Sequence, residues 1–404
     1  MGAGSLLEIV ARGAQDKYNI GNPQITFFKT VYKRHTNFSM ESMPQYFMEQ
    51  PDFGKRVSCI IDRRADLLSE LVLEIELPAL EQNVSWINAI GHTMIKTVEL
   101  TIGGEVIVSM TGEYLDIDSE LTVPSSQRNG YYKMISKTPN FSRTAQSGAL
   151  HLYVPLPFWF CRDLGRVLPL IAMQYSEIRI NIDFKPFNEC WYSGTSMSII
   201  PQTKHISSAT LYCDYIYLDT YERTKFATMP EIEYMIEQVQ VVEGNSTPAN
   251  NTLINADIFF NHPVKEILWI YQADEVALTN DWLNFSLTLD NDTTVQIQEP
   301  AISACKLKLN GQDRFDYRAG DYFRLVQPYQ RHTTSPDNFV YSYSFAIHPE
   351  EPQPSGSCNF SKIDNTVLEV QFNSSIPAGQ IRVYAVNMNI LKIKNGMTGL
   401  MFSD

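Results

Sequence analysis

Apolar and polar residues alternate one by one along much of this chain. The alternation is clear in Leu71–Leu77 (L-V-L-E-I-E-L), in Leu211–Leu218 (L-Y-C-D-Y-I-Y-L) and in Ile381–Leu391 (I-R-V-Y-A-V-N-M-N-I-L). Successive side chains of a β-strand point to opposite faces of the sheet, so this period of two is typical of a half-buried strand. The pattern predicts a protein built mainly of strands.

Further short runs of the same kind predict strands in both halves of the chain. In the first half they are Val57–Ile61, Thr97–Ile102, Val106–Met110, His151–Leu156 and Ser176–Phe184. In the second half they are Ile232–Val242, Ile258–Phe260, Val264–Tyr271, Trp282–Leu289, Tyr341–Phe345 and Asn365–Phe372. Short strands separated by Gly, Pro and Asn at roughly 8 to 12 residue intervals indicate a β-sandwich or barrel in each half.

One segment occurs twice, about 207 residues apart. Glu99–Leu115 (E-L-T-I-G-G-E-V-I-V-S-M-T-G-E-Y-L) and Lys306–Phe323 (K-L-K-L-N-G-Q-D-R-F-D-Y-R-A-G-D-Y-F) both read as strand, glycine turn and strand. After a one-residue slip, the Gly-Glu-Tyr that begins at Gly112 matches the Gly-Asp-Tyr that begins at Gly320. The recurrence predicts two copies of one domain.

The repeat and the strand count lead to a definite domain plan. We expect two tandem eight-stranded jelly-roll sandwiches, with a short N-terminal helical arm and a few short helices in loops. The polar stretch Thr220–Pro230 contains a proline and separates the two strand-rich halves. The plan is an arm at residues 1–24, a first jelly roll at 25–222, a linker at 223–231 and a second jelly roll at 232–404.

Three sites predict helices. Ser5-Leu6-Leu7-Glu8 has the form of a capping box, after which Leu6, Ile9 and Val10 share one helical face and Gly13 ends the helix. Pro124-Ser125-Ser126 has the form of a helix entry, and the bulky residues after Pro157 lose the period of two.

Composition excludes some classes of function. The formal net charge is −13, which argues against a protein that coats nucleic acid, because neutralising phosphate needs clustered Lys and Arg. No apolar run reaches the length of a membrane span, and the N-terminus lacks the pattern of a signal peptide. Six scattered cysteines without a C-x-x-C pair fit buried thiols in a reducing, cytosolic setting.

No catalytic or metal-binding motif stands out in the sequence. The closest two histidines, His332 and His348, are too far apart for the paired strand ligands of a cupin, and there is no P-loop, G-x-S-x-G or H-E-x-x-H. Asp116-Ile117-Asp118 could hold a hard cation on a strand or turn, or could be a solvated edge. We therefore expect no enzyme activity, no cofactor and no metal, although carboxylate pairs distant in sequence would escape such a search.

Two stretches could bind partners. Pro155–Phe160 (P-L-P-F-W-F) is either an aromatic platform for a sugar or an aromatic plug that seals one end of a sandwich. Lys29, Lys33 and Arg34 lie in a stretch from Lys17 to Met40 that has no acidic residue. They form either a solvated face or a contact with an acidic partner or an anionic membrane surface.

Several motifs resemble the major capsid proteins of nucleocytoplasmic large DNA viruses. The longest is Gly21–Phe38 (G-N-P-Q-I-T-F-F-K-T-V-Y-K-R-H-T-N-F), and the resemblance continues through Pro155–Cys161, Tyr217–Phe226, Leu307–Arg314, Pro354–Phe360 and Tyr384–Met397. The matching segments run from one end of the chain to the other.

The resemblance implies a structural subunit with a double jelly roll. Such a protein would form a homotrimer with a pseudo-hexagonal outline, and these capsomers would tile an icosahedral shell over an internal membrane. The arm would face inward, so the residues that the resemblance implies as assembly contacts are Ser5, Leu6, Ile9, Val10, Lys29, Lys33 and Arg34.

The implied partners are other copies of the chain, minor capsid proteins, a penton protein and the nearby membrane, without direct nucleic-acid contact. The implied location is the virion, after assembly in the host cytoplasm. The alternative that the sequence leaves open is a carbohydrate-binding protein or hydrolase on tandem jelly rolls.

Overall fold

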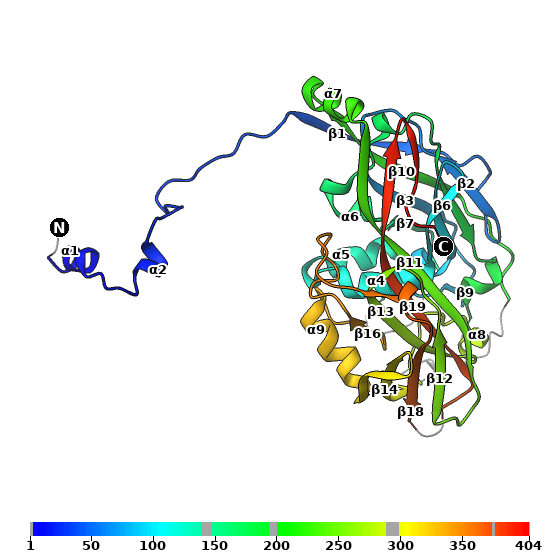
Figure 1. The fold of residues 1–404 in the computed structure, drawn as a ribbon. Coiled ribbons are helices and arrows are strands. Elements are labelled where there is room, and N and C mark those ends of the chain that lie inside the picture. The colour runs from blue at the N-terminus through cyan, green and yellow to red at the C-terminus, as the bar shows by residue number, and fades with distance from the viewer. Residues whose placement is uncertain (1–2, 139–146, 194–199, 288–298, 374–375, 404) are drawn as a thin grey trace. The chain divides into compact units, whose positions relative to one another are not determined.

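The structure is a computed structural model that describes residues 3–138, 147–193, 200–287, 299–373 and 376–403. Residues 1–37 and 38–404 form two separate units, and each is described by itself. Figure 1 shows the fold.

The N-terminal unit contains two short helices, α1 (Ala3–Val10) and α2 (Lys17–Ile20). Ser5 lies inside α1, not before it, so the predicted capping box is wrong. The helix also ends at Val10, before Gly13. Residues 23–37 contain no helix or strand, and the first strand of the protein begins at Phe38, whereas the first jelly roll was expected to begin at residue 25.

The first half of the larger unit holds two four-stranded antiparallel sheets. One sheet has the order β1 (Phe38–Gln45), β10 (Ser208–Leu218), β3 (Leu67–Leu77) and β7 (Leu150–Pro155). The other has the order β2 (Arg56–Ile60), β8 (Ile178–Phe184), β5 (Ile95–Ile102) and β6 (Glu105–Thr111).

The second half repeats this arrangement. One sheet has the order β11 (Glu231–Thr247), β19 (Gly379–Lys394), β13 (Pro263–Ala273) and β16 (Tyr341–Ser344), with β17 (Cys358–Asn359) on β13 and β20 (Met397–Leu400) on β19. The other has the order β12 (Leu253–Ile258), β18 (Thr366–Phe372), β14 (Ile302–Leu309) and β15 (Gln312–Ala319).

The two halves have the same topology. The eight main strands of each half can be numbered one to eight in chain order. In both halves one sheet then has the order one, eight, three, six, and the other has the order two, seven, four, five. This is the connectivity of a jelly roll. The predicted fold of two tandem eight-stranded jelly rolls is confirmed.

The repeated sequence segment forms an equivalent hairpin in each jelly roll. Gly103 and Gly104 join β5 to β6, and Asn310 and Gly311 join β14 to β15. All four have positive φ, between 49° and 90°, which a two-residue hairpin turn matched to the twist of its strands requires. Glycine and asparagine tolerate this region best, which explains the shared composition of the turns.

Helices fill the connections between strands. In the first jelly roll they are α3 (Ile90–Thr93), α4 (Gly112–Thr122), α5 (Ser125–Ile135), α6 (Trp159–Arg162) and the 3-10 turns Leu164–Arg166, Leu170–Ala172 and Phe187–Glu189. A two-stranded ribbon pairs β4 (Ser85–Trp86) with β9 (Trp191–Tyr192). The helix entry at Pro124 and the helical break after Pro157 are both confirmed.

The second jelly roll has fewer helical connections. They are α8 (Val276–Thr279), η5 (Tyr322–Val326), α9 (Gln327–Arg331) and η6 (Phe360–Lys362). Helix α7 (Thr220–Thr228) joins the two jelly rolls, and most of the stretch expected as the linker is helical. Asp219 starts this helix by accepting a hydrogen bond from the Thr220 amide.

Two of the predicted strands are wrong in detail. The described part of Trp282–Leu289, residues 282–287, has no strand, and the rest of that run lies outside the described residues. Strand β12 ends at Ile258, where the sequence suggested that a strand begins. Residues 283–287 alternate between apolar and polar side chains without forming a strand, so a short alternating run also occurs in a buried loop.

Strand β13 differs from its equivalent β3 in having both faces buried. Residues 264–273 are all buried, whereas in β3 Glu70 and Glu76 are exposed. One face of β13 packs inside its own jelly roll, and the other is covered by the first jelly roll. No helix in the described ranges is long and apolar enough to cross a membrane.

Candidate functional site at the junction of the two jelly rolls

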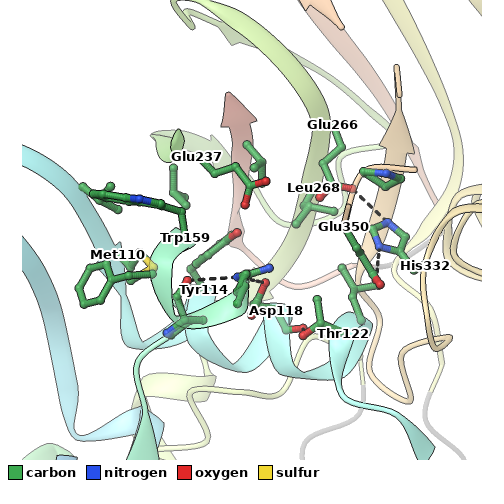
Figure 2. A pocket seen from close by; sticks show the side chains of 18 residues that line it. Met110, Tyr114, Asp118, Thr122, Trp159, Glu237, Glu266, Leu268, His332 and Glu350 are labelled. Carbon is green, nitrogen blue, oxygen red and sulfur yellow. Dashed lines mark hydrogen bonds and ion pairs between the residues drawn. The ribbon is translucent and has the colours of Figure 1, made fainter. Parts of the chain in front are cut away.

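The two jelly rolls meet along a buried boundary that we call the junction. The first jelly roll contributes β6, α4 and α6, and the second contributes β11, β13, β19 and the loops around His332 and Glu350. Val108, Met110 and Trp159 from one side face Val239 and Leu268 from the other. Figure 2 shows this boundary from close by.

Paired charged side chains lie in the apolar part of the junction. Arg162 Nη2 donates to Asp118 Oδ1 at 2.6 Å within the first jelly roll. Glu237 of β11 accepts from Lys265 Nζ at 2.8 Å within the second jelly roll and lies 3.4 Å from Arg166 Nη1 of the first. A buried charge is tolerated only when it is paired, so the contact between Glu237 and Arg166 restricts how the two jelly rolls face each other.

His332 is held between two carboxylates at the edge of the junction (Figure 2). Its Nε2 lies 3.1 Å from Glu266 Oε2, and its Nδ1 lies 3.0 Å from Glu350 Oε1. Burial alone would lower the pKa of His332, but the charges of Glu266 and Glu350 and their hydrogen bonds outweigh burial and raise it to about 10. His332 is therefore an imidazolium at neutral pH.

A second buried network lies on α4. Asp116 Oδ1 and Glu120 Oε1 each accept from Lys137 Nζ at 2.7 Å, and Asp116 Oδ1 lies 3.4 Å from His92 Nδ1. Burial alone would raise the pKa of Asp116, but Lys137 and His92 lower it to about 2. The backbone carbonyl of Glu120 also accepts from Thr334 Oγ1 of the second jelly roll at 2.8 Å.

These contacts correct the two interpretations of Asp116 and Asp118, a cation site on a strand or turn and a solvated edge. Both residues lie on a helix and are buried, so they form neither a strand pair nor a solvated edge. Their carboxylates bind Lys137 and Arg162 of the protein itself. Among the described residues, no group of His, Cys, Asp and Glu has the arrangement of a metal site.

A wider groove opens at the other end of the junction. It has a volume of about 510 Å³ and is lined by residues of β5, β6, β11 and β19. Inside it, Glu113 forms an ion pair with Arg382, and Glu113 Oε1 accepts from Tyr384 Oη at 2.8 Å. Burial raises the pKa of Glu113, and Arg382 and Tyr384 only partly offset this effect.

The C-terminal hairpin of the second jelly roll also contacts the first. The Tyr175 amide donates to the Gly396 carbonyl at 2.9 Å, and the Thr398 amide donates to Ser176 Oγ at 2.8 Å. A side chain at position 396 would meet the Tyr175 ring, with an ideal Cβ only 2.6 Å from it. One main-chain hydrogen bond and one hydrogen bond to a side chain thus join the two jelly rolls at a second place.

The aromatic run after Pro155 belongs to the core. Phe158, Trp159 and Phe160 are each 1% exposed, and the rings of Phe158 and Phe160 stack with centroids 5.7 Å apart. Rings buried to this extent cannot present a face to a sugar. The plug interpretation is the one that fits, and Trp159 also lines the junction.

The predicted arm residues belong to the N-terminal unit. Leu6, Ile9 and Val10 are exposed on α1, and Ser5, Lys29, Lys33 and Arg34 are exposed as well.

The sequence did not reveal the junction network. One signal was available: Lys265 and Glu266 interrupt the otherwise apolar run of β13, which is unusual for a strand buried on both faces. Their partners Glu237 and His332 are distant in sequence, so the pairing could not be inferred.

What this arrangement can do chemically is limited. The enclosed space at the charged part of the junction is about 30 Å³, which has room for little more than a water molecule. Burial also raises the pKa of Cys59 to about 12, and likewise raises the pKa of Cys190 and Cys305, so these thiols are unreactive. The paired charges are suited to holding the two jelly rolls rigidly together.

Comparison with known families covers nearly the whole chain. The family described as major capsid protein N-terminus matches residues 26–219, and the family described as large eukaryotic DNA virus major capsid protein matches residues 222–399.

Individual relatives match from end to end. The major capsid protein of Pyramimonas orientalis virus is 40% identical over 99% of this chain and 100% of the relative. That of Phaeocystis pouchetii virus is 36% identical over 100% of both chains. A solved chain from the PBCV-1 virus capsid is 31% identical, with a TM-score of 0.82 over 94% of this chain and 100% of that one.

The relatives are named for a structural role in the capsid, in agreement with a junction that is packed and charge-paired. This chain belongs to the major capsid proteins of large eukaryotic DNA viruses, and with other copies of itself it forms the shell of the virion.

Proposed function

We propose that three copies of this chain form a capsomer with a pseudo-hexagonal outline, and that these capsomers tile an icosahedral shell. Two jelly rolls of one topology are present in each chain, so a trimer presents six similar units around its axis. A hexagonal tile needs six similar edges, and duplication within a trimer supplies them from a single gene product.

The observation that carries this proposal is the junction. Glu237 of the second jelly roll pairs with Arg166 of the first, and Thr334 pairs with the backbone of Glu120, so the two jelly rolls form one body. A tile must hold its edges at constant angles, and buried paired charges with a packed apolar surround resist rotation.

We also propose how the chain divides into domains. The arm is residues 1–24, the first jelly roll 25–222, the linker 223–231 and the second jelly roll 232–404. Helix α7 overlaps the linker and gives it a defined length.

We infer that the arm contacts the inner layers of the particle. The contacts would be made by Ser5, Leu6, Ile9, Val10, Lys29, Lys33 and Arg34, which are all exposed. The apolar face of α1 needs a partner, and the basic residues favour an acidic one. Minor capsid proteins, a penton protein and an internal membrane are the proposed neighbours, and the host cytoplasm is the proposed place of assembly.

Light scattering and electron microscopy of the purified chain test the trimer. The expected mass is about three times 46.1 kDa, and single particles should be hexagonal in projection. A monomer that persists at high concentration, or particles without a hexagonal outline, would contradict the proposal.

Deleting residues 1–24 tests the arm. We expect the trimer to remain folded and of unchanged mass, because the body has its own core, and we expect capsid assembly to fail. Loss of trimers on deletion would show instead that the arm holds the three chains together. Normal assembly of the shortened chain would show that the arm is dispensable.

A further inference from the structure

The wider groove at the end of the junction has the size and the lining of a site for a small ligand. Its volume of about 510 Å³ lies within the range of small-molecule pockets. Apolar side chains, among them Ile95, Val241 and Leu283, line it together with hydroxyl, amide and charged groups. A mixed lining of this kind suits a ligand that has both apolar and polar parts.

Lys185 lies in this groove without an anionic partner. It directly follows β8, and its Nζ lies 4.5 Å from the centroid of the Trp282 ring. Within the described ranges, this ammonium group has no ion pair and no hydrogen bond. Burial lowers the pKa of Lys185, and nearby negative groups offset this effect only in part. An anion from outside the chain would supply the missing partner.

The wall beside Lys185 is held in place by the protein itself. Trp282 Nε1 donates to the Glu189 carbonyl at 2.9 Å, and Gln272 Nε2 donates to the Trp282 carbonyl at 2.5 Å. Arg382 Nη2 donates in turn to Gln272 Oε1 at 2.8 Å. The indole over which the ammonium packs is therefore fixed before any ligand binds, which reduces the entropic cost of binding.

The charges of the groove favour an anion with a single negative charge. Among the described residues that line it, three are cations, Lys96, Lys185 and Arg382, and two are carboxylates, Glu113 and Glu243. The excess is one positive charge, in a chain whose formal net charge is −13. One carboxylate would balance this excess, whereas the second charge of a phosphate monoester would be repelled by Glu113 and Glu243.

Uncharged polar groups of the groove are also free to bind a ligand. In the part of the chain that the structure describes, the side chains of Ser109 and Gln380 line the groove and make no hydrogen bond. Hydroxyl and amide groups both donate and accept, as recognition of a polyol requires. The apolar lining suits the C–H groups of a sugar ring.

We propose that this groove binds an acidic sugar, whose carboxylate pairs with Lys185 and whose hydroxyl groups bind Ser109 and Gln380. The inference goes beyond the structural role and does not depend on the trimer, because every residue that carries it belongs to one chain.

Calorimetric titration of the purified full chain tests the ligand class. The probes are methyl glucuronide, its neutral counterpart methyl glucoside, and acetate. We expect saturable binding of the glucuronide. The glucoside should bind about tenfold more weakly or worse, because it lacks the partner of Lys185. Acetate should be weaker by a similar factor, because it lacks the ring and its hydroxyl groups.

Lys185→Met tests the site, since methionine keeps an unbranched apolar side chain and removes the charge. Binding of the glucuronide should weaken by about tenfold or more. The melting temperature should stay close to that of the parent or rise, because the variant loses an unpaired, partly buried charge. Lys133→Met is the matched control. Lys133 is exposed on α5 and does not line the groove, so the parent affinity should remain.

Each other outcome overturns a stated part of the inference. Equal affinity for the glucuronide and the glucoside would rule out recognition of the carboxylate. Acetate that binds as tightly as the glucuronide would show a site for any small anion and not for a sugar. Unchanged affinity of Lys185→Met would place binding outside this groove. A parent that does not bind the glucuronide would overturn the inference, while the mass of the trimer would still test the proposed capsomer.

Discussion

Each buried charge at the junction is held by specific partners, and one of these contacts, between Glu237 and Arg166, joins the two jelly rolls. Asp118 has Arg162, Glu237 has Lys265 and Arg166, and His332 has Glu266 and Glu350. Removing one partner leaves the other charge buried and unpaired, which costs far more than the pair contributes.

Replacing Arg162 with Ala should therefore lower the free energy of unfolding by about 3 kcal/mol, because Asp118 is buried and would lose its cation. The comparison is Arg179→Ala, since Arg179 pairs with Glu177 at the surface and should change stability by less than about 0.5 kcal/mol. Chemical denaturation of both variants measures the difference. Equal effects would mean that the Arg162 pair is not buried in solution.

His332 makes the stability of the junction depend on pH. Its pKa is about 10 in the folded protein and near the ordinary histidine value of 6.5 when unfolded, so the folded state binds the proton more tightly. The stabilisation is complete below about pH 6.5 and is lost as the pH rises through 10, with a size on the order of a few kcal/mol.

The test is the difference in unfolding free energy between the parent and His332→Gln, measured from pH 6 to pH 10. The gap should be largest at pH 6 and should narrow toward pH 10. His205→Gln is the control, because His205 is an exposed residue beside Asp52. A gap that does not change with pH would rule out a charged His332.

At the scale of elements, alternation and turn residues predicted most of the sheet framework. The repeated hairpin was recognised because its turns need positive φ, which restricts them to glycine and asparagine. The sequence did not predict a helix at Asp116 and Asp118. Helix α4 is buried on nearly all sides, so its sequence shows no amphipathic period.

The glycine after each hairpin has a packing role that explains its recurrence. An ideal Cβ on Gly112 would lie 2.2 Å from the Ile95 carbonyl oxygen, and one on Gly320 would lie 2.6 Å from that of Ile302. Each helix begins against the backbone of the first strand of the hairpin, and only glycine permits this approach.

We therefore expect Gly112→Ala to lower the unfolding free energy by about 2 kcal/mol or more, because the backbone must move to admit the methyl group. Gly130→Ala in α5 is the matched control. It has nothing within 4 Å of its Cβ, so it should be neutral or should stabilise the protein by up to about 1 kcal/mol. Thermal denaturation compares the two. Similar melting temperatures would refute the close approach at Gly112.

At the scale of the whole molecule, the two jelly rolls should unfold together. Both jelly rolls contribute side chains to the junction, and the C-terminal hairpin adds hydrogen bonds to the Tyr175 amide and the Ser176 hydroxyl. Calorimetry of the parent should show one cooperative transition.

Ending the chain at Lys394 should lower the melting temperature and broaden this transition. The truncation removes β20 and its contact with the first jelly roll, while the junction network remains. The control is a chain ending at Ser403, which keeps the hairpin. A truncated protein that melts like the parent would show that the hairpin contact contributes nothing to the joint.

The sequence alone determined the class of fold, the duplication, the hairpin turns and the family, because periodicity, turn chemistry and long motifs are local properties of the chain. Only the tertiary structure decided that Asp116 and Asp118 are buried, that His332 is charged, and that β13 is covered on both sides. These depend on side chains far apart in sequence, such as Glu237 with Arg166 and His332 with Glu266, because burial and charge pairing are settled only when distant segments of the chain pack together.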